Sequence, residues 1–471
     1  MTSLPIDAQQ KPKVLIVGAG IGGVCLALLL EKAGVPYLVL ERADEIKFLG
    51  SAIALGVNAM PFFKQVGLYE DFKKVAKENH KIDEFNENRE LEFTMDFSAT
   101  FEIGGDRGYI ISRPVLHELL LRGVPKEKIL MKKRVLTMMQ GDIGVSVTCA
   151  DQTVYEGDML VGADGAYSAV RQALYERMKK NKKLPASDNV PLPFTTTCLV
   201  GRTEPLSPTE FPELLEPMSR FRSVKGDNKP YSWMTLTTAD NRICWVVIEY
   251  LNEQSSKEND SFRQSEWGQE AAESMCKLVR DFPIPVGPEG SNMTLGTLLD
   301  RTPKDLISKV MLEEKVFTTW YHGRTILLGD ACHKVHIASG AGALNAMQDA
   351  IVLANWIAAL PSLAIEDMEQ IFKEYKKERF DVAMSAYNNG RMLSKVPGAG
   401  LTSKIIRYMT RNVPDFLWLI MLKNMAASRP QVWFLPLAKD TGTIPPRDQP
   451  SLRKNLHKAA SLDTQGQAVS A

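Results

Sequence analysis

The chain lacks the cysteine patterns of a disulfide framework or a cysteine-based metal site. Its six cysteines are scattered over 471 residues, and no two of them form a C-x-x-C motif. Secreted small domains and zinc modules are therefore not expected, and a reducing, cytoplasmic compartment fits this usage.

It also lacks a long uninterrupted apolar run. Residues 1–10 are polar, without the basic start and apolar core of a secretion signal. The apolar stretch 14–30 is interrupted by four glycines, and Phe416–Leu422 is far shorter than the roughly 18 residues that a membrane span needs. We expect a cytoplasmic protein, with peripheral membrane contact through the C-terminal segment left open.

No charge sign dominates the sequence. Lysine plus arginine number 57 and aspartate plus glutamate 56, so no global field favours nucleic acid, and no nucleic-acid partner is expected. With 44% apolar residues the chain can bury a large core, and its length predicts two lobes, which are either consecutive or interleaved in the sequence.

A glycine-rich turn opens the chain between a β-branched run, 14–17, and a helical pattern. Gly18 permits a tight turn, Gly20 lets a pyrophosphate approach the backbone, and Gly23 lets the helix pack on the strand. Glu41 ends the next strand, 37–40, where a carboxylate binds ribose hydroxyls, and Arg42 beside it is assigned to the same site. The pattern predicts adenine-dinucleotide binding but does not separate NAD from FAD. The alternative is a glycine-rich turn without a ligand.

Two later segments identify the cofactor. Residues 158–171 (DMLVGADGAYSAVR) and 324–333 (RTILLGDACH) resemble the Asp-Gly and Gly-Asp fingerprints of FAD-dependent monooxygenases of the aromatic-hydroxylase type, the class A flavoproteins. With the first motif they occur in the family's order over most of the chain. The resemblance implies an α/β fold: a Rossmann-like FAD-binding domain of the glutathione-reductase type, interleaved with a substrate domain of mixed or antiparallel sheet, plus C-terminal helices.

Composition and the resemblance together predict the domain limits. A proline-rich stretch at 185–193 and alternating apolar residues at 243–248 indicate a second lobe, and the last residues are polar with few large apolar groups. The predicted units are a discontinuous FAD-binding domain (11–75, 105–180 and 300–395), a substrate domain (76–104 and 181–299), a C-terminal helical segment (396–440) and a disordered tail (441–471).

The resemblance also implies the cofactor contacts. Asp330 accepts a hydrogen bond from the ribityl chain of FAD, and the glycines after it, with Ala343, bring backbone amides of a helix start to the flavin ring. Arg113 lies along the FAD. The predicted contacts in these segments are Arg113, Asp164, Ser168, Arg171, Asp330, Gly340, Gly342 and Ala343.

Each contact has a purely structural alternative. Asp330 is then a helix cap, Arg113 a surface residue, Asp164 a cap that ties strand to helix, and Arg171 the partner of a carboxylate.

The loop over the flavin departs from the family pattern. Ile337 stands where many relatives have proline, Ala341 where they have glutamine and Leu344 where they have asparagine. The glycines persist, so FAD binding is still expected, but substrate placement and oxygen control differ.

The implied reaction is a monooxygenation. NAD(P)H reduces FAD, O2 adds at flavin C4a, and the hydroperoxide transfers one oxygen atom to an organic substrate, aromatic or terpenoid, by hydroxylation or epoxidation. Residues 429–437 resemble the end of fungal secondary-metabolism members. The predicted substrate-positioning pair is Arg202 and Tyr231, with surface or core roles as the alternative. An FAD-dependent reductase or dehydrogenase without oxygen insertion, and a non-catalytic flavin protein, are the rival functions.

No metal is assigned. His333 and His336 lack a third ligand nearby, and Cys332 is interpreted as a small buried residue rather than a covalent flavin anchor. In the C-terminal segment, Ile405, Ile406, Phe416, Trp418 and Met421 either cover the active site, rest on a membrane surface or simply pack on the FAD lobe.

Overall fold

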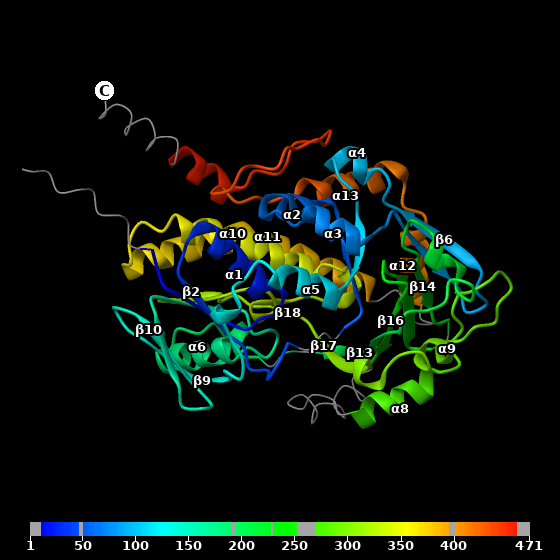
Figure 1. The fold of residues 1–471 in the computed structure, drawn as a ribbon, viewed down its shortest axis with the longest axis horizontal. Coiled ribbons are helices and arrows are strands. Elements are labelled where there is room, and N and C mark those ends of the chain that lie inside the picture. Colours follow the sequence, from blue (N-terminus) through cyan, green and yellow to red (C-terminus); the bar gives the residue numbers. More distant parts are fainter. Residues whose placement is uncertain are drawn as a thin grey trace, which may run out of the picture.

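The fold comes from a computed structural model, which describes residues 11–46, 50–190, 192, 194–227, 229–251, 269–394 and 401–458. Two large sheets lie side by side, with helices packed over them (Figure 1). Among the described residues, no helix is both long and apolar enough to cross a membrane.

The first sheet has six strands in the order β19-β20-β12-β1-β2-β8. Its centre is parallel, because β1 pairs with β2 and β12, and β12 pairs with β20 in the same direction. The central runs are short and apolar on both faces, as a sheet covered on both sides requires. The strands are β1 (Val14–Val17), β2 (Tyr37–Leu40), β8 (Ile129–Leu130), β12 (Met159–Gly162), β19 (Tyr321–His322) and β20 (Thr325–Leu327).

The second sheet has seven strands in the order β17-β13-β16-β15-β14-β5-β6, antiparallel except between β14 and β5. Side chains alternate between its two faces, as the pleat requires. One face packs under α8 (Gln269–Val279) and α9 (Leu295–Leu299). The other faces residues 335–341, the loop that the sequence predicts to lie over the flavin and that is called the flavin loop below. The strands are β5 (Lys81–Phe85), β6 (Leu91–Asp96), β13 (Phe194–Arg202), β14 (Phe221–Lys225), β15 (Tyr231–Thr237), β16 (Ile243–Tyr250) and β17 (Ser308–Glu313).

Smaller sheets and helices complete the two lobes. The short strands are β3 (Ala52–Leu55), β4 (Lys77–Glu78), β7 (Tyr109–Ser112), β9 (Val135–Gln140), β10 (Val145–Cys149), β11 (Val154–Gly157), β18 (Lys315–Val316) and β21 (His333–Lys334). The helices are α1 (Ile21–Ala33), α2 (Met60–Val66), α3 (Tyr69–Val75), α4 (Thr100–Gly104), α5 (Arg113–Leu121), α6 (Ala169–Lys180), α10 (Gly342–Ala358), α11 (Ile365–Leu393), α12 (Leu401–Arg411) and α13 (Asp415–Ala427). The interleaved α/β architecture predicted from the sequence is confirmed.

One predicted domain limit shifts. β17 pairs antiparallel with β13, so the substrate-side sheet extends to residue 313 instead of ending at 299. The sequence of β17 carries a lysine and a serine among its apolar residues, which hid the strand because edge strands need only one apolar face.

The chain from residue 429 to residue 458, called the C-terminal strap below, crosses α2 and α10 (Figure 1). Residues 450–458 are helical, and Ser451 is fully buried. Its amide and hydroxyl both donate to the Glu378 carboxylate at 3.0 Å, while Asn455 bonds the Asn355 carbonyl at 3.3 Å. The prediction of a disordered tail from residue 441 is therefore wrong for residues 441–458, which polar contacts hold in place. Residues 459–471 lie outside the described residues.

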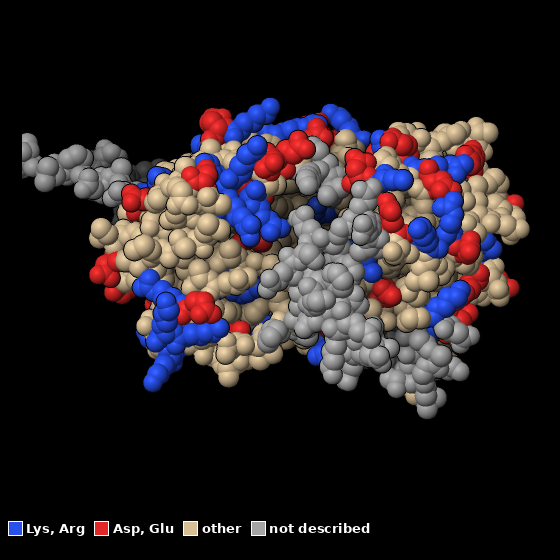
Figure 2. Space-filling model, turned by 90° about the horizontal axis from the view of Figure 1, so that it is seen from below, with Lys and Arg blue, Asp and Glu red and all other residues tan. Residues whose placement is uncertain are grey.

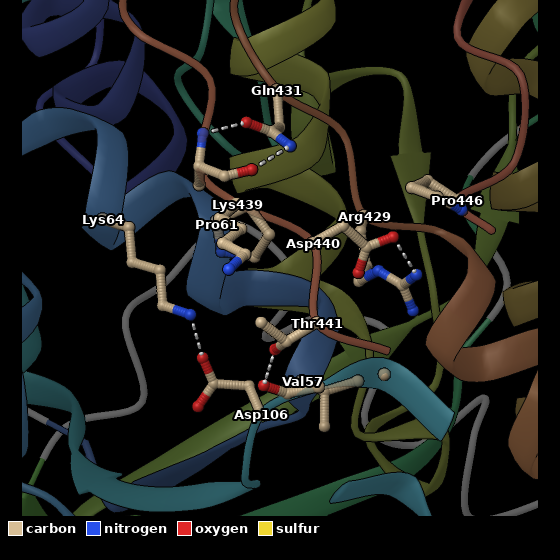
Figure 3. Close-up of a pocket in the computed structure, with 13 residues that line it drawn as sticks. Val57, Pro61, Lys64, Asp106, Arg429, Gln431, Lys439, Asp440, Thr441 and Pro446 are labelled. Atoms are coloured by element: carbon tan, nitrogen blue, oxygen red, sulfur yellow. Dashed lines mark hydrogen bonds and ion pairs between the residues drawn. The ribbon is translucent and has the colours of Figure 1, made fainter. Parts of the chain in front are cut away.

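A small hollow lies beneath this strap (Figure 3). Four of the charged side chains that line it form two ion pairs: Lys64 with Asp106 at 2.7 Å, and Arg429 with Asp440 at 3.0 Å. On the outside, basic and acidic side chains are interspersed over the face in Figure 2, in line with the balanced composition.

Candidate FAD-binding site

The first glycine turn is fixed by two close approaches. Gly18 has φ +105°, and a Cβ there would lie 2.5 Å from the Ala163 carbonyl oxygen. A Cβ on Gly23 would lie 2.0 Å from the carbonyl oxygen of Gly18. Neither position accepts a side chain, so these glycines join the turn to the end of β12.

Gly20 has a different role, because a Cβ there would meet nothing within 4 Å. It precedes α1, whose first turn has no side-chain cap. Glu41 lies beside this helix start, where its carboxylate accepts hydrogen bonds from the amides of Ala19 at 2.8 Å and Ala43 at 2.9 Å. Open space over uncapped amides, with a fixed carboxylate next to it, fits a dinucleotide diphosphate and its ribose.

Asp164 and its neighbours tie β12 to α6. One Asp164 oxygen accepts from the amides of Ala169 at 2.7 Å and Val170 at 3.2 Å, and Ser168 caps the same helix through the Arg171 amide at 2.9 Å. The other Asp164 oxygen, Oδ1, is buried and has no hydrogen-bond partner among the described residues. Burial raises the Asp164 pKa. Capping of α6 thus accounts for Oδ2 of Asp164 only. Oδ1 is left to accept a hydrogen bond from a donor on the cofactor.

Arg171 connects two fingerprints that are far apart in the sequence. Its guanidinium donates to the carbonyl of Ala331 at 2.7 Å and to that of Ala166 at 2.6 Å. The structural alternative, in which Arg171 pairs with a carboxylate, is wrong for the described residues, since both hydrogen-bond partners are backbone carbonyls and the ring contact is Phe317.

The Gly-Asp turn presents a carboxylate with a cation. Gly329 has φ +62°, and Asp330 pairs with Lys334 through Oδ2 and Nζ at 2.5 Å. Asp330 makes no helix-capping bond, so that alternative is wrong. Arg113 lies within electrostatic reach: burial lowers its pKa and the Asp330 charge opposes the shift. Its side chain also passes Gly50, where a Cβ would be 2.9 Å from Cδ.

The start of α10 is a second uncapped helix end. Gly340 has φ +61°, neither it nor Gly342 has an atom within 4 Å of its Cβ position, and Ala341 offers no side-chain cap. The amides around Ala343 therefore face open space at the positive end of a helix, which suits an electron-rich ring edge.

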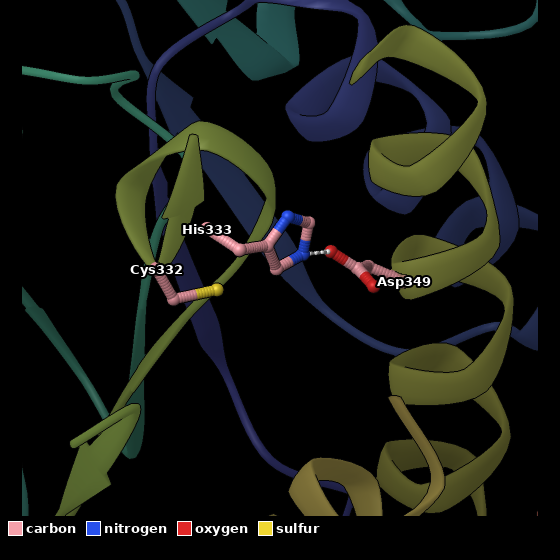
Figure 4. Close-up of side chains that lie close together, drawn as sticks. All are labelled: Cys332, His333 and Asp349. Atoms are coloured by element: carbon pink, nitrogen blue, oxygen red, sulfur yellow. Dashed lines mark hydrogen bonds and ion pairs between the residues drawn. The ribbon is translucent and has the colours of Figure 1, made fainter. Parts of the chain in front are cut away.

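A buried network that the sequence did not reveal holds this turn to the helices (Figure 4). Asp349 on α10 accepts from Arg379 on α11 at 2.6 Å, from His333 Nε2 at 2.5 Å and from the Gly329 amide at 3.0 Å. Burial acts to raise the Asp349 pKa, but the charges of His333 and Arg379 outweigh it and bring the pKa to about 2.

Cys332, His333 and Asp349 could in principle hold a metal ion. The Arg379 guanidinium already supplies the cation that balances Asp349, so no metal is needed there.

The second histidine belongs to the flavin loop. His336 Nδ1 accepts from the Ala338 amide at 3.1 Å, so its Nε2 carries the proton and donates to Thr196 Oγ1 at 3.2 Å. Burial lowers the His336 pKa to about 4. This neutral imidazole links the loop to β13, and Ile337 next to it packs on the same sheet.

The two predicted substrate residues lie on opposite faces of the seven-stranded sheet. Arg202 shares the face of Val200 and donates to Ser112 Oγ at 3.1 Å, toward the FAD side. Tyr231 lies on the other face, where it bonds Glu249 at 2.8 Å and contacts Phe282 edge-on. The prediction that Tyr231 and Arg202 position the substrate together is therefore wrong. Arg202 aligns across the strands with Leu236 of β15, and Tyr231 lies five residues from Leu236, so its side chain points to the other face.

Of the two C-terminal helices, α12 covers the seven-stranded sheet and α13 exposes apolar side chains. Arg411 of α12 reaches Glu84 of the seven-stranded sheet, so this helix lies over the sheet. Trp418 of α13 donates to the Asp96 carbonyl at 2.8 Å, whereas Phe416 is 64% and Met421 46% exposed. Ile405 is exposed as well, and the side chain of Ile406 lies outside the described residues.

Comparison with known proteins gives one family and one fold. A family model described as FAD binding domain matches residues 11–276 and 296–389. The FAD-dependent monooxygenase ausM of Penicillium brasilianum is 29% identical over 405 residues, which cover 83% of this chain and 80% of ausM. The FAD-dependent monooxygenase paxM of Penicillium paxilli is 28% identical over 454 residues, or 91% of this chain and 88% of paxM.

Solved structures share the architecture. HpxO of Klebsiella pneumoniae, complexed with FAD and uric acid, superposes with a TM-score of 0.69 at 18% identity, covering 88% of this chain and 97% of HpxO. CtdE, in complex with FAD and a substrate, gives 0.68 at 15% identity, covering 96% and 100%.

Proposed function

The chain belongs to the FAD binding domain family, and we propose that it is an FAD-dependent monooxygenase that uses NAD(P)H and O2 to insert one oxygen atom into an organic substrate. The observation that carries this proposal is the pair of uncapped helix starts, α1 and α10, with open space at Gly20, Gly340 and Gly342. Fungal relatives named as FAD-dependent monooxygenases support it over most of the chain.

The residues divide the cofactor between them. Glu41 would take the ribose hydroxyls, the α1 amides the diphosphate, Asp330 the ribityl chain and the α10 amides the ring. Bound FAD supplies the redox chemistry, with two electrons from NAD(P)H, while one atom of O2 enters the product and the other leaves as water.

The substrate is placed by this chain's own residues. The face of the seven-stranded sheet that is turned toward the flavin loop is apolar at Val200 and Val246. These side chains exclude water from the place where oxygen transfer must occur. Arg202 at the edge of this face is the proposed polar positioning residue. Hydroxylation and epoxidation of an aromatic or terpenoid compound are the proposed reactions, and a reductase without oxygen insertion is the alternative.

The test starts with the absorbance spectrum of the purified protein, followed by NADPH and NADH oxidation in air and mass spectrometry of the product. A flavin spectrum and a product heavier by one oxygen atom support the monooxygenase. Reduction of the substrate without mass gain of oxygen favours the reductase, and absence of flavin after added FAD rejects the proposal.

A matched pair of glycine variants isolates the FAD contact. Gly20→Ala places a methyl group in the open space over α1 and is expected to lower FAD affinity at least tenfold, since a diphosphate needs that approach. Gly141→Ala adds the same methyl where nothing lies within 4 Å in a distant turn, and should bind FAD normally. Fluorescence titration of FAD measures both; equal affinities would contradict the assignment.

We also propose that this protein is cytoplasmic and touches a membrane surface reversibly through α13. Its exposed large apolar side chains form a patch of a kind that usually marks a binding surface. They are Phe416, Leu417, Leu419, Ile420, Met421 and Met425.

A further inference from the structure

The flavin-facing side of the seven-stranded sheet changes character from one edge to the other. The registers define two cross-strand rows on this face. The first row is Val310, Cys198, Ile248, Ser232 and Lys225, and the second is Ser308, Val200, Val246, Met234, Ser223 and Glu84. Both rows run from apolar residues on β13 and β16 to polar residues on β14 and β5.

The apolar end lies against the flavin loop. Cys198, Val200, Val246 and Ile248 are buried together, and Ile337 of the loop packs against them. Because the loop also carries the start of α10, a substrate atom at this end is the one nearest the flavin ring.

The polar end lies under α12, which Figure 1 places next to β14. Arg411 Nη2 approaches Glu84 Oε1 at 3.5 Å, and Arg407 Nη1 approaches Asp227 Oδ1 at 3.5 Å. Lys225 feels the charges of both Glu84 and Arg407, and burial lowers its pKa. Three cations from β14 and α12 therefore lie around this end of the sheet, where Ser223 pairs with Glu84 across the strands.

Several donors at this end have no acceptor. Ser223 is 4% exposed, and its hydroxyl has no hydrogen-bond partner among the described residues. The same holds for Arg407 Nε and Nη2 and for Arg411 Nε, all shielded from solvent. An unpaired buried donor lowers the stability of the fold, so such a group of donors is retained where a ligand brings acceptor oxygens.

The nearby carboxylates do not satisfy these donors. Glu84, Glu92 and Asp227 engage only the outer nitrogens of Arg411 and Arg407. A ligand oxygen would add the missing acceptors.

We propose that this face is a two-ended substrate site, in which Lys225, Arg407, Arg411 and Ser223 bind an acidic oxygen group of the substrate, a carboxylate or an enolate. The remainder of the substrate is apolar and lies along the sheet toward Ile337. From β13 to β14 there are three strand spacings, about 14 Å, which sets the distance from the acidic group to the oxidised atom. The inference rests on the proposed function and names its substrate class: elongated, mainly apolar acids.

The experiment uses the FAD-loaded protein and three probes of one chain length: dodecanoate, dodecanol and dodecylamine. Each is titrated while the flavin absorbance is recorded, with calorimetry as a second readout. Dodecanoate is expected to bind at least tenfold more tightly than either of the others, because only it carries an anionic acceptor group. Equal affinities for the three probes, or preference for the amine, overturn the proposal.

Variants locate the acidic group. Lys225→Met and Arg407→Met should each weaken dodecanoate binding about tenfold and change dodecanol binding less than twofold, while Lys225→Arg keeps most of the affinity. Lys229→Met is the matched control: the same substitution four residues away, at a lysine paired with Glu87 on the outside of the hairpin. Similar losses in Lys225→Met and Lys229→Met reject the site.

The two levels of failure are separable. A protein that binds FAD and oxidises NAD(P)H but does not discriminate among the probes refutes this site alone. A protein without FAD binding refutes the proposed function. Where a variant loses flavin, its melting temperature and the Lys225→Arg result decide between misfolding and loss of the site.

Discussion

Glu41 and Asp330 are carboxylates at the two ends of the proposed FAD site, and their partners differ. Glu41 is held by two backbone amides, of Ala19 and Ala43, which fix its position without neutralising its charge. Asp330 instead pairs with the ammonium of Lys334, with Arg113 nearby. Glu41 therefore offers hydroxyl groups a carboxylate without a cation beside it, whereas the negative charge of Asp330 is already balanced by Lys334.

Glu41→Gln should weaken FAD binding roughly tenfold to a hundredfold. The amide keeps the shape but loses the charge, and a hydrogen bond to a charged group contributes about 1.5–3 kcal/mol. Fluorescence titration with FAD measures the change. Glu31→Gln, on the exposed side of α1 where the carboxylate pairs with Lys128, is the control and should bind like the parent protein.

Lys334→Met should lower the reduction potential of bound FAD. Removing the ammonium leaves the Asp330 charge unbalanced within the proposed flavin site, which disfavours the negative charge of reduced flavin more than the neutral oxidised form. A tenfold shift in the ratio of the two dissociation constants corresponds to about 30 mV for two electrons. Spectroelectrochemical titration measures it, Lys334→Arg should restore the potential, and an unchanged potential in Lys334→Met would argue against this role.

At the scale of elements, α10 and α11 carry the polar groups that hold the site together. Asp349 on α10 accepts a hydrogen bond from the Gly329 amide of the Gly-Asp turn, and Arg379 on α11 holds Asp349 in place from inside the core. One residue before Arg379, Glu378 on α11 accepts hydrogen bonds from the amide and the hydroxyl of Ser451, near the start of the last described helical stretch. The C-terminal strap is thus fastened to the same two helices that support the flavin turn.

Docking of residues 450–458 should weaken as pH rises toward 7. Burial raises the Glu378 pKa from 4.5 to about 7, so the docked state binds a proton that the undocked state releases. Its stability is therefore full below about pH 4.5 and falls as pH rises through 7. Hydrogen exchange of residues 450–458, corrected for intrinsic rates, measures the slope between pH 5 and 8.

Glu378→Gln should remove most of that pH dependence. Glu374→Gln is the control, because Glu374 pairs with Lys454 at the surface between the same two segments. If both variants keep the parent slope, the titrating group is not Glu378.

At the scale of the whole molecule, the seven-stranded sheet meets the other lobe at two places. Thr196 bonds His336 of the flavin loop, where Ile337 also packs, and Arg202 bonds Ser112 of β7. The C-terminal helices cover the other end of the same face: α12 lies over the polar edge of that sheet, and α13 packs on α4 and leaves its outer side apolar and exposed. A membrane surface reached through α13 would bring apolar substrates close to α12.

Vesicle binding tests this arrangement. Phe416→Ser together with Ile420→Ser should reduce co-sedimentation with phosphatidylcholine–phosphatidylserine vesicles at least fivefold, since burial of each large apolar side chain contributes about 1.5–3 kcal/mol. Met139→Ser together with Ile143→Ser, at two exposed apolar positions outside α13, is the control and should sediment like the parent protein. No difference between the two double variants would refute contact through α13.

The family and the core of the fold were predictable from the sequence, because their signals are local. One βαβ turn requires a β-branched run before Gly18, a glycine at each constrained position and Glu41 at the end of the next strand. These residues lie close together in the sequence. The same holds for the strand that delivers Asp330. The direction of Tyr231 was also readable in part, since it shares strand parity with Trp233, which is fully buried on the α8 side.

What only the tertiary structure decided is which polar groups find partners across long stretches of chain. Arg379 reaches Asp349, Ser451 reaches Glu378, and Arg171 reaches the Ala331 carbonyl, over separations of 30 to 160 residues. The same long-range packing left the Ser223 hydroxyl, Nε and Nη2 of Arg407 and Nε of Arg411 buried without an acceptor among the described residues. A sequence determines local conformation through neighbouring residues, whereas burial and hydrogen-bond partners depend on which distant segments exclude water together.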